Sequence, residues 1–132
     1  MAVPTIMTPG HKISIRDHDA LVEVRVDGHT LASTRNAKVL IETGLPLRYY
    51  IPRADVVATL SRTETGSHCP FKGDASYWSV RAGDAVMKDV AWSYEEPIPD
   101  AKPIAGRVAF FNERVDIVLD GAVQERPRTP WS

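Results

Sequence analysis

Apolar and polar residues alternate with a period of two along most of this chain, which is the pattern of β-strands that bury one face. Val22, Val24 and Val26 alternate with charged side chains. The Asp27-Gly28 pair that follows is a typical hairpin turn, because both residue types accept positive φ at little cost. We therefore predict a β-hairpin around this pair, with the returning strand over residues 29–33.

The same alternation predicts further strands with tight turns between them. Near the middle of the chain, Val86, Val90, Trp92 and Tyr94 share one parity and are expected on one face of a strand. Together the predicted strands describe an all-β domain of eight or nine antiparallel strands with at most one short helix. Besides the first hairpin, the clearest of these strands are predicted at residues 37–42, 77–81, 86–94, 108–110 and 115–119, and a further short strand is predicted before Asp17.

Two segments do not follow the strand pattern. Residues 53–60 carry Val56, Val57 and Leu60 at helical spacing after a proline, which predicts the one short helix. Residues 97–103 contain three prolines, which remove backbone donors and predict a loop.

Length and composition are those of one ordinary globular domain. The chain has 132 residues, of which 43% are hydrophobic and 25% are charged. Because prolines gather toward both ends, we expect an extended N-terminal arm over residues 1–10 and an extended C-terminal tail over residues 125–132. Residues 11–124 would then form a single β domain.

Charge and cysteine content exclude several classes of function. Sixteen basic and seventeen acidic residues give a net charge of −1, which argues against nucleic acid or an anionic membrane as partner. A single cysteine excludes an internal disulfide and a Cys-rich zinc site. No apolar run is long enough to cross a membrane, and the N-terminus lacks the layout of a signal peptide. We therefore expect a cytoplasmic protein without a metal or other cofactor.

The residues with the most reactive chemistry surround the one cysteine. Cys69 precedes Pro70, which favours extended geometry, and Lys72 follows where its charge would favour the thiolate. Cys69 and Lys72 are thus a candidate catalytic pair, with His68 as a proton-transfer group. The alternative is that Cys69 is a buried core residue, the usual role of a free cysteine. His68 would then point to the opposite face of the strand.

A second group of candidates would bind a ligand rather than react with it. Tyrosine and tryptophan rings can form an aromatic wall, and an arginine fork suits a carboxylate or phosphate. The alternative is that the rings fill the core and the arginines are solvated. Tyr49 and Arg48 belong to the same aromatic and basic stretches. The predicted ligand-binding residues are Arg35, Tyr50, Arg53, Tyr77, Trp78, Trp92 and Tyr94.

The segment Cys69-Pro70-Phe71-Lys72-Gly73, followed by Tyr77-Trp78, resembles domain-of-unknown-function family 427. The resemblance covers roughly residues 12–119. It implies a compact β-tent, in which two antiparallel sheets meet at an angle with a cleft between them. The family is also called nucleotidyltransferase-like, but the Gly-Ser segment and paired acidic ligands that would hold a nucleotide and magnesium are missing here. Further matches are Arg35, the 49–52 run with Asp55, the 91–94 run with Pro97, and residues 104–110.

Three functions remain open at this point. The first is a cleft for a small molecule, anionic or aromatic, around Cys69, Lys72, Trp78 and Trp92. The second is an enzyme that uses Cys69 as a nucleophile or redox thiol. The third is a structural or partner-binding β domain without a small-molecule site.

Overall fold

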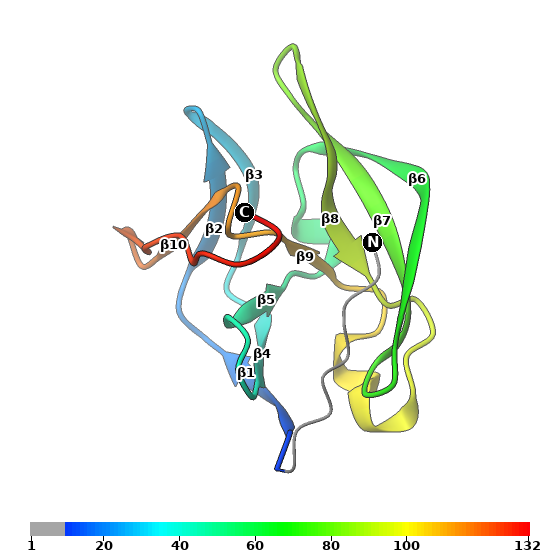
Figure 1. The fold of residues 1–132 in the computed structure, drawn as a ribbon. Helices are drawn as coiled ribbons and strands as arrows, with labels where there is room; N and C mark the ends of the chain where they lie inside the picture. Colours follow the sequence, from blue (N-terminus) through cyan, green and yellow to red (C-terminus); the bar gives the residue numbers. More distant parts are fainter. Residues whose placement is uncertain (1–9) are drawn as a thin grey trace.

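The computed structural model describes residues 10–132, which form antiparallel β-structure with short connections (Figure 1). This part of the chain contains eleven strands and two short 3₁₀ helices but no α-helix, which confirms the prediction of an all-β domain. The strands are β1 (Ile13–His18), β2 (Val22–Val26), β3 (His29–Thr34), β4 (Ala37–Glu42), β5 (Arg48–Tyr50), β6 (Thr59–Cys69), β7 (Gly73–Ala82), β8 (Ala85–Ser93), β9 (Val108–Phe110), β10 (Asp116–Leu119) and β11 (Ala122–Val123); the 3₁₀ helices are η1 (Arg53–Asp55) and η2 (Pro99–Ile104).

The strands pair into three antiparallel sheets, one more than the family resemblance implied. Their strand orders are β1-β4-β5, β11-β10-β2-β3 and β6-β7-β8-β9. A β-bridge between Ile51 and Val108 connects the end of β5 to β9, so the three-stranded sheet adjoins the sheet of β6 to β9. Figure 1 shows β2 and β3 on one side of the molecule, the β6–β7–β8 hairpins on the other, and β5 and β9 between them.

The predicted hairpin turn is confirmed. β2 and β3 pair directly, and Asp27 and Gly28 both have positive φ, 47° and 80°. The valines of β2 are buried and alternate with more exposed polar residues, as the period-two pattern requires.

The predicted helix over residues 53–60 is wrong beyond its first turn. Only η1 is helical, and Val57 is 68% exposed. The backbone N–H groups of Val57 and Ala58 both donate to the carbonyl of Leu31, and Val56 forms a β-bridge with Ala32. The chain is therefore held extended against β3, and β-branched valines suit that geometry.

The predicted loop over residues 97–103 instead contains η2. Pro99 at its first position has the φ that a helical turn needs, and its missing N–H would have no partner there in any case. Ala101 and Ile104 anchor this turn because both are fully buried.

The expectation that β8 presents one apolar face is also only partly met. Val90 packs into a different core from Trp92, because β8 is bulged opposite Ser79 and Asp89 has a φ of 54°. Val86 is 58% exposed because it lies near the tip of the β7–β8 hairpin, which extends beyond the body of the molecule (Figure 1).

Two clusters of buried side chains stabilise the fold. The larger, here called the aliphatic core, is mostly valine, leucine, isoleucine and alanine, and includes Val24, Leu31 and Val108. The second, here called the aromatic core, lies mainly between β5, β7 and β8. Its buried members are Leu40, Tyr50, Cys69, Ala75, Tyr77, Trp92, Tyr94, Ala101, Ile104, Ala109 and Phe111.

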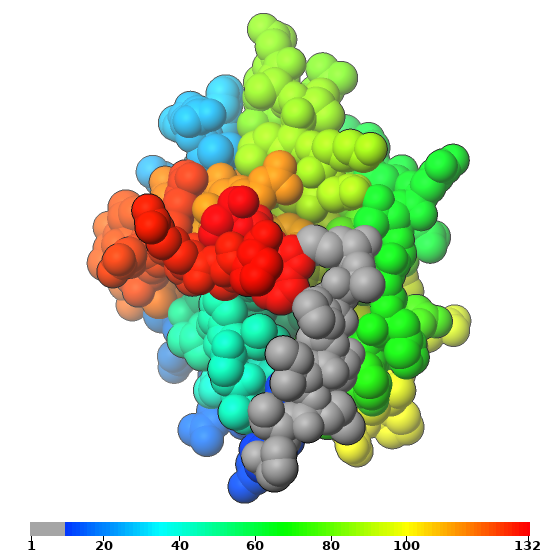
Figure 2. Space-filling view, viewed as in Figure 1, coloured from blue at the N-terminus to red at the C-terminus, as the bar shows by residue number. Residues whose placement is uncertain are grey.

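The C-terminal segment has no regular secondary structure after β11, yet it is attached at several points. Arg126 forms an ion pair with Asp116, and the Thr129 hydroxyl donates to Glu113 over 2.5 Å. Trp131 packs half-buried against the aromatic core. Figure 2 shows this segment lying across the surface beside the β4–β5 turn. The expected N-terminal arm lies, apart from Gly10, outside the described residues.

Candidate functional site

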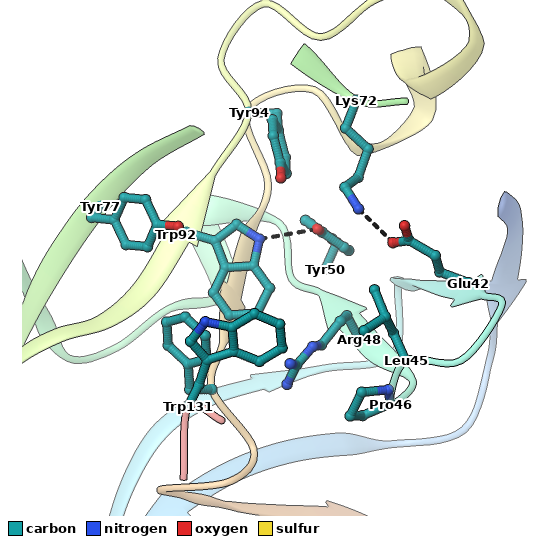
Figure 3. Close-up of a pocket in the computed structure, with 11 residues that line it drawn as sticks. Glu42, Leu45, Pro46, Arg48, Tyr50, Lys72, Tyr77, Trp92, Tyr94 and Trp131 are labelled. Carbon is teal, nitrogen blue, oxygen red and sulfur yellow. Dashed lines mark hydrogen bonds and ion pairs between the residues drawn. The ribbon is translucent and has the colours of Figure 1, made fainter. Parts of the chain in front are cut away.

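A pocket of about 50 Å³ opens between the sheet β1-β4-β5 and the sheet β6-β7-β8-β9 (Figure 3). One part of its wall is apolar or aromatic, and consists of Leu45, Pro46, Tyr77, Trp92, Phe111 and Trp131. The other part carries polar groups, from Glu42, Arg48, Tyr50, Lys72 and Tyr94. Two other hollows, of about 220 and 150 Å³, are larger, but neither is lined by buried ion-paired cations. We therefore treat the smaller pocket as the candidate site.

Strand periodicity explains how the lining side chains reach one space. Arg48 and Tyr50 are two residues apart on β5 and share a face, as do Trp92 near the end of β8 and Tyr94 directly after it. Tyr77 of β7 lies directly opposite Trp92 in the ladder, so both rings project from the same side of their sheet.

Lys72 is held in the pocket by a chain of contacts that begins with Phe71. The Phe71 ring stacks on His11 with 4.7 Å between the ring centroids. His11 is bonded through Nε2 to Oε2 of Glu42 over 2.8 Å. The other oxygen of that carboxylate, Oε1, accepts a hydrogen bond from Nζ of Lys72 over 2.5 Å. Both ends of this ion pair are buried, which fixes the direction of the lysine side chain.

The turn between β6 and β7 sets the backbone of Lys72. Its N–H donates to the carbonyl of Cys69, and its own carbonyl accepts from the N–H of Ile98. Gly73 follows with a φ of 119°, and a Cβ there would lie 3.3 Å from Cα of Pro97. Only glycine fits this position without strain. The segment singled out in the sequence therefore presents the lysine rather than the cysteine to the pocket.

Arg48 forms a second buried ion pair, beside the aromatic wall. Its two terminal nitrogens donate to both oxygens of Glu113, over 2.6 and 2.9 Å. Its guanidinium carbon lies 5.2 Å from the ring centroid of Trp92 and 5.7 Å from that of Phe111, within range of cation–π attraction. Thr129 donates to the same carboxylate. Arg48 is thus joined through Glu113 to the C-terminal segment that carries Trp131.

Burial would by itself raise the pKa of the Glu113 carboxyl. The hydrogen bonds from Arg48 and Thr129 outweigh that effect, so the pKa of Glu113 lies below its ordinary value. The carboxylate is therefore ionised at neutral pH and compensates the charge of Arg48.

Two tyrosine hydroxyls point into the polar part of the pocket, toward Lys72 (Figure 3). The Tyr50 oxygen accepts a hydrogen bond from Nε1 of Trp92 over 3.1 Å. The Tyr94 hydroxyl has no hydrogen-bond partner among residues 10–132. Burial raises the pKa of both tyrosines, so both remain protonated at neutral pH.

The structure brings together some of the residues predicted from sequence. Five of them line the pocket, namely Tyr50, Lys72, Tyr77, Trp92 and Tyr94. Four of them do not, namely Arg35, Cys69, Arg53 and Trp78.

Cys69 is 7% exposed and belongs to the aromatic core, where its neighbours are apolar and aromatic side chains. His68, next in sequence, points away and pairs with Asp74 at the surface. The two side chains therefore lie on opposite faces of β6, which is the arrangement expected if the cysteine is a core residue.

Trp78 lies on the opposite face of β7 from Tyr77 and packs against the aliphatic core. Its Nε1 donates to Ser93, and Arg53 lies over its ring at 4.6 Å. Arg53 is also paired with Glu95 at the surface. Arg35 is exposed. Trp78 and Arg53 therefore form a second tryptophan–arginine pair, which lies outside the pocket.

Sequence reasoning missed several lining residues because they come from distant segments. Glu42 ends a strand in which both faces are partly buried, so its parity was uninformative. Phe111 directly follows β9, and Trp131 lies in a segment expected to be a tail. The one available signal was the position of Arg48 two residues before the predicted Tyr50, which places both side chains on the same face of a strand.

Within residues 10–132, no helix is long and apolar enough to span a membrane, and no group of three or more His, Cys, Asp or Glu side chains could hold a metal ion. No curated protein matches the chain. The sequence profile of one family, described as a domain of unknown function (DUF427), matches residues 14–121. This match spans both the pocket turn and most of the fold, and the chain belongs to that family.

Proposed function

We propose that the protein binds a small organic molecule in the pocket between β5 and β8. The observation that supports this most directly is the convergence of two buried ion pairs and two tyrosine hydroxyls on one pocket. Replacing a buried ion pair with apolar residues of similar volume is often neutral or stabilising. Two such pairs beside one pocket are therefore better explained by recognition of a ligand than by stability.

The shape of the site limits the size of the ligand. A volume of about 50 Å³ holds about four water molecules, which corresponds to a compact group of few atoms. Trp131 forms one wall and belongs to a segment without secondary structure. A larger ligand would have to displace this ring.

A cysteine-dependent reaction has less support. The thiol of Cys69 does not line the pocket, whereas Lys72 three residues later does. A Cys69→Ser variant is expected to keep ligand binding. In the unmodified protein, alkylation of the Cys69 thiol is expected to be slow at all pH values where the protein is folded.

A fragment screen by ligand-observed NMR tests the binding proposal. The screen should contain carboxylates, amides, amines and alcohols of about six heavy atoms. Fragments that bind the unmodified protein are expected to lose binding in Leu45→Trp, because the added ring would fill the pocket. The matched control is Leu47→Trp, two residues away, since Leu47 is 44% exposed and outside this pocket. Absence of any hit, or hits unaffected by Leu45→Trp, would contradict the proposal.

A further inference from the structure

The two carboxylates that pair with the pocket's cations already form hydrogen bonds through all of their oxygens. Oε1 of Glu42 accepts from Lys72, and Oε2 is bonded to His11. The second carboxylate, Glu113, is bonded to Arg48 through both oxygens and also accepts from Thr129. A donor group on a ligand would therefore have to share these oxygens with the donors already bound to them.

Donor groups, in contrast, are in surplus at the polar part of the pocket. A lysine ammonium has three N–H donors, and one hydrogen bond is formed by that of Lys72 among residues 10–132. Within the same residues, the Tyr50 oxygen accepts from Trp92, but no acceptor receives its own O–H. The Tyr94 hydroxyl has no partner there either. Since burial raises the pKa of both tyrosines, both keep the proton that they would donate.

These unused donors come from three elements but face one space (Figure 3). Lys72 comes from the β6–β7 turn, Tyr50 from β5 and Tyr94 from the residues after β8. Tyr94 lines the pocket, and its hydroxyl oxygen is not among the fully buried unpaired atoms of residues 10–132. A ligand that supplies acceptor oxygens at this point would therefore replace water as the hydrogen-bond partner of these donors.

The charge balance narrows the ligand class. The cations Lys72 and Arg48 are each already paired with one carboxylate. Because both cations are paired, each negative charge that a ligand brings must be stabilised mainly by hydrogen-bond donors, which disfavours a dianion such as a phosphate ester more than a monoanion. A carboxylate carries one negative charge and has about four acceptor sites, which suits several donors near a paired cation.

We propose that the ligand is a small monocarboxylate, with its carboxylate at Lys72, Tyr50 and Tyr94 and a compact apolar body against Leu45, Trp92 and Trp131. This inference rests on the proposed binding function and specifies its ligand class. It assigns Lys72 a binding role, without a covalent step.

A series of related probes tests this ligand class. Isobutyrate, isobutyramide and isobutylamine have similar branched bodies but differ in the polar group, and inorganic phosphate supplies oxygens without a body. Titrations of the whole chain at pH 7, followed by the NMR signals of the tryptophan indole N–H groups, give the relative affinities. Isobutyrate is expected to bind at least tenfold more tightly than each of the others.

Two matched variants separate the proposed contacts from general effects on folding. Tyr94→Phe removes one donor and is expected to weaken isobutyrate binding about tenfold, the usual size for a hydrogen bond to a charged group. Tyr49→Phe is the control, because Tyr49 lies on the opposite face of β5 in the aliphatic core. That variant is expected to bind isobutyrate as the unmodified chain does.

The outcomes distinguish this inference from the broader proposal. If isobutyramide or isobutylamine binds as tightly as isobutyrate and Leu45→Trp abolishes that binding, the pocket is a ligand site but the carboxylate class is wrong. If phosphate binds more tightly than isobutyrate, the proposal that the ligand has an apolar body is contradicted. If isobutyrate binding is equal in Tyr94→Phe and Tyr49→Phe, the assignment of the donors is overturned. Failure of every probe and every fragment would overturn the binding function itself.

Discussion

The two cores of this protein bury side chains of different chemistry. The aliphatic core is closed around residues such as Val24 and Leu31, which have no polar atoms in their side chains. The aromatic core contains hydroxyls and an indole N–H, and adjoins two buried ion pairs. Apolar side chains lose no hydrogen bonds when they leave water, whereas buried charges and hydroxyls each need a new hydrogen-bond or ion-pair partner. The first region therefore accounts for stability, and the second retains polar groups for which ligand binding gives a reason.

Both cores also contain a tryptophan with an arginine over its ring, which makes the contrast sharper. Arg48 lies over Trp92 at 5.2 Å inside the pocket, where the pair is buried. Arg53 lies over Trp78 at 4.6 Å, but its guanidinium is near the surface and paired with an exposed carboxylate. The same contact thus occurs once in the candidate pocket and once as surface packing.

The largest expected effect concerns the ion pair under the aromatic wall. Glu113→Gln leaves the buried Arg48 without its compensating charge and is expected to lower the free energy of unfolding by about 3–5 kcal/mol at pH 7. Denaturant titration measures this. A loss below about 1 kcal/mol would show that the pair contributes little.

The same variant has a pH signature. The pKa of Glu113 in the folded protein lies below the ordinary value near 4.5, so its ionisation contributes stability above that pH. This contribution is lost as the pH falls through 4.5 toward the lower pKa of the folded state. The unmodified protein should therefore lose stability in this range more steeply than Glu113→Gln. Parallel curves for the two proteins would contradict the assignment.

A cavity in the aliphatic core should affect stability without affecting the pocket. Leu31→Ala removes a side chain that is 1% exposed and is expected to cost about 3 kcal/mol. Isobutyrate affinity, measured where the variant is still folded, should stay within twofold of the unmodified protein. A tenfold loss of affinity would show that the two cores are coupled.

Replacing the tryptophan outside the pocket is expected to have an intermediate effect on stability. Trp78 is half-buried against the aliphatic core, so Trp78→Ala should cost about 2 kcal/mol, less than the value for a fully buried ring. Thermal unfolding and isobutyrate titration of the same sample check this together. Binding lost at unchanged stability would place Trp78 in the ligand site instead.

The smallest effect is expected for the arginine over that ring. Arg53→Ala removes an exposed ion pair and an exposed cation–π contact, which together are expected to contribute less than about 1 kcal/mol. Ligand affinity should not change. A larger loss of stability in denaturant titration would contradict the distinction between the two tryptophan–arginine pairs.

The fold class could be predicted from sequence because strand periodicity is local. The valines of β2 and the Asp27-Gly28 turn were sufficient for one hairpin, since side-chain direction and φ are properties of the segment itself. The helix expected after Pro52 failed because a tertiary contact, the carbonyl of Leu31, holds that segment extended. Local spacing contains no information about such a partner.

The candidate site could be predicted only in part, for the same reason. That Tyr77 and Trp78 face opposite sides follows from adjacency, but which side contains the pocket depends on how the sheets pack. Glu42 and Trp131 reach the pocket from strand and tail segments that lie 89 positions apart in sequence. The turn motif is visible in the sequence, but the sequence leaves open whether Cys69 reacts together with Lys72 or is a core residue, because burial of the thiol depends on tertiary packing.

The three tryptophans provide the most direct test of the division between the two regions. Their indole N–H signals report on the pocket wall at Trp92 and Trp131 and on the aliphatic side at Trp78. On titration with isobutyrate, the signals of Trp92 and Trp131 should shift with one common saturation curve while that of Trp78 stays in place. A saturable shift confined to Trp78, or no shift of any indole at saturating isobutyrate, would contradict a ligand site in the aromatic core.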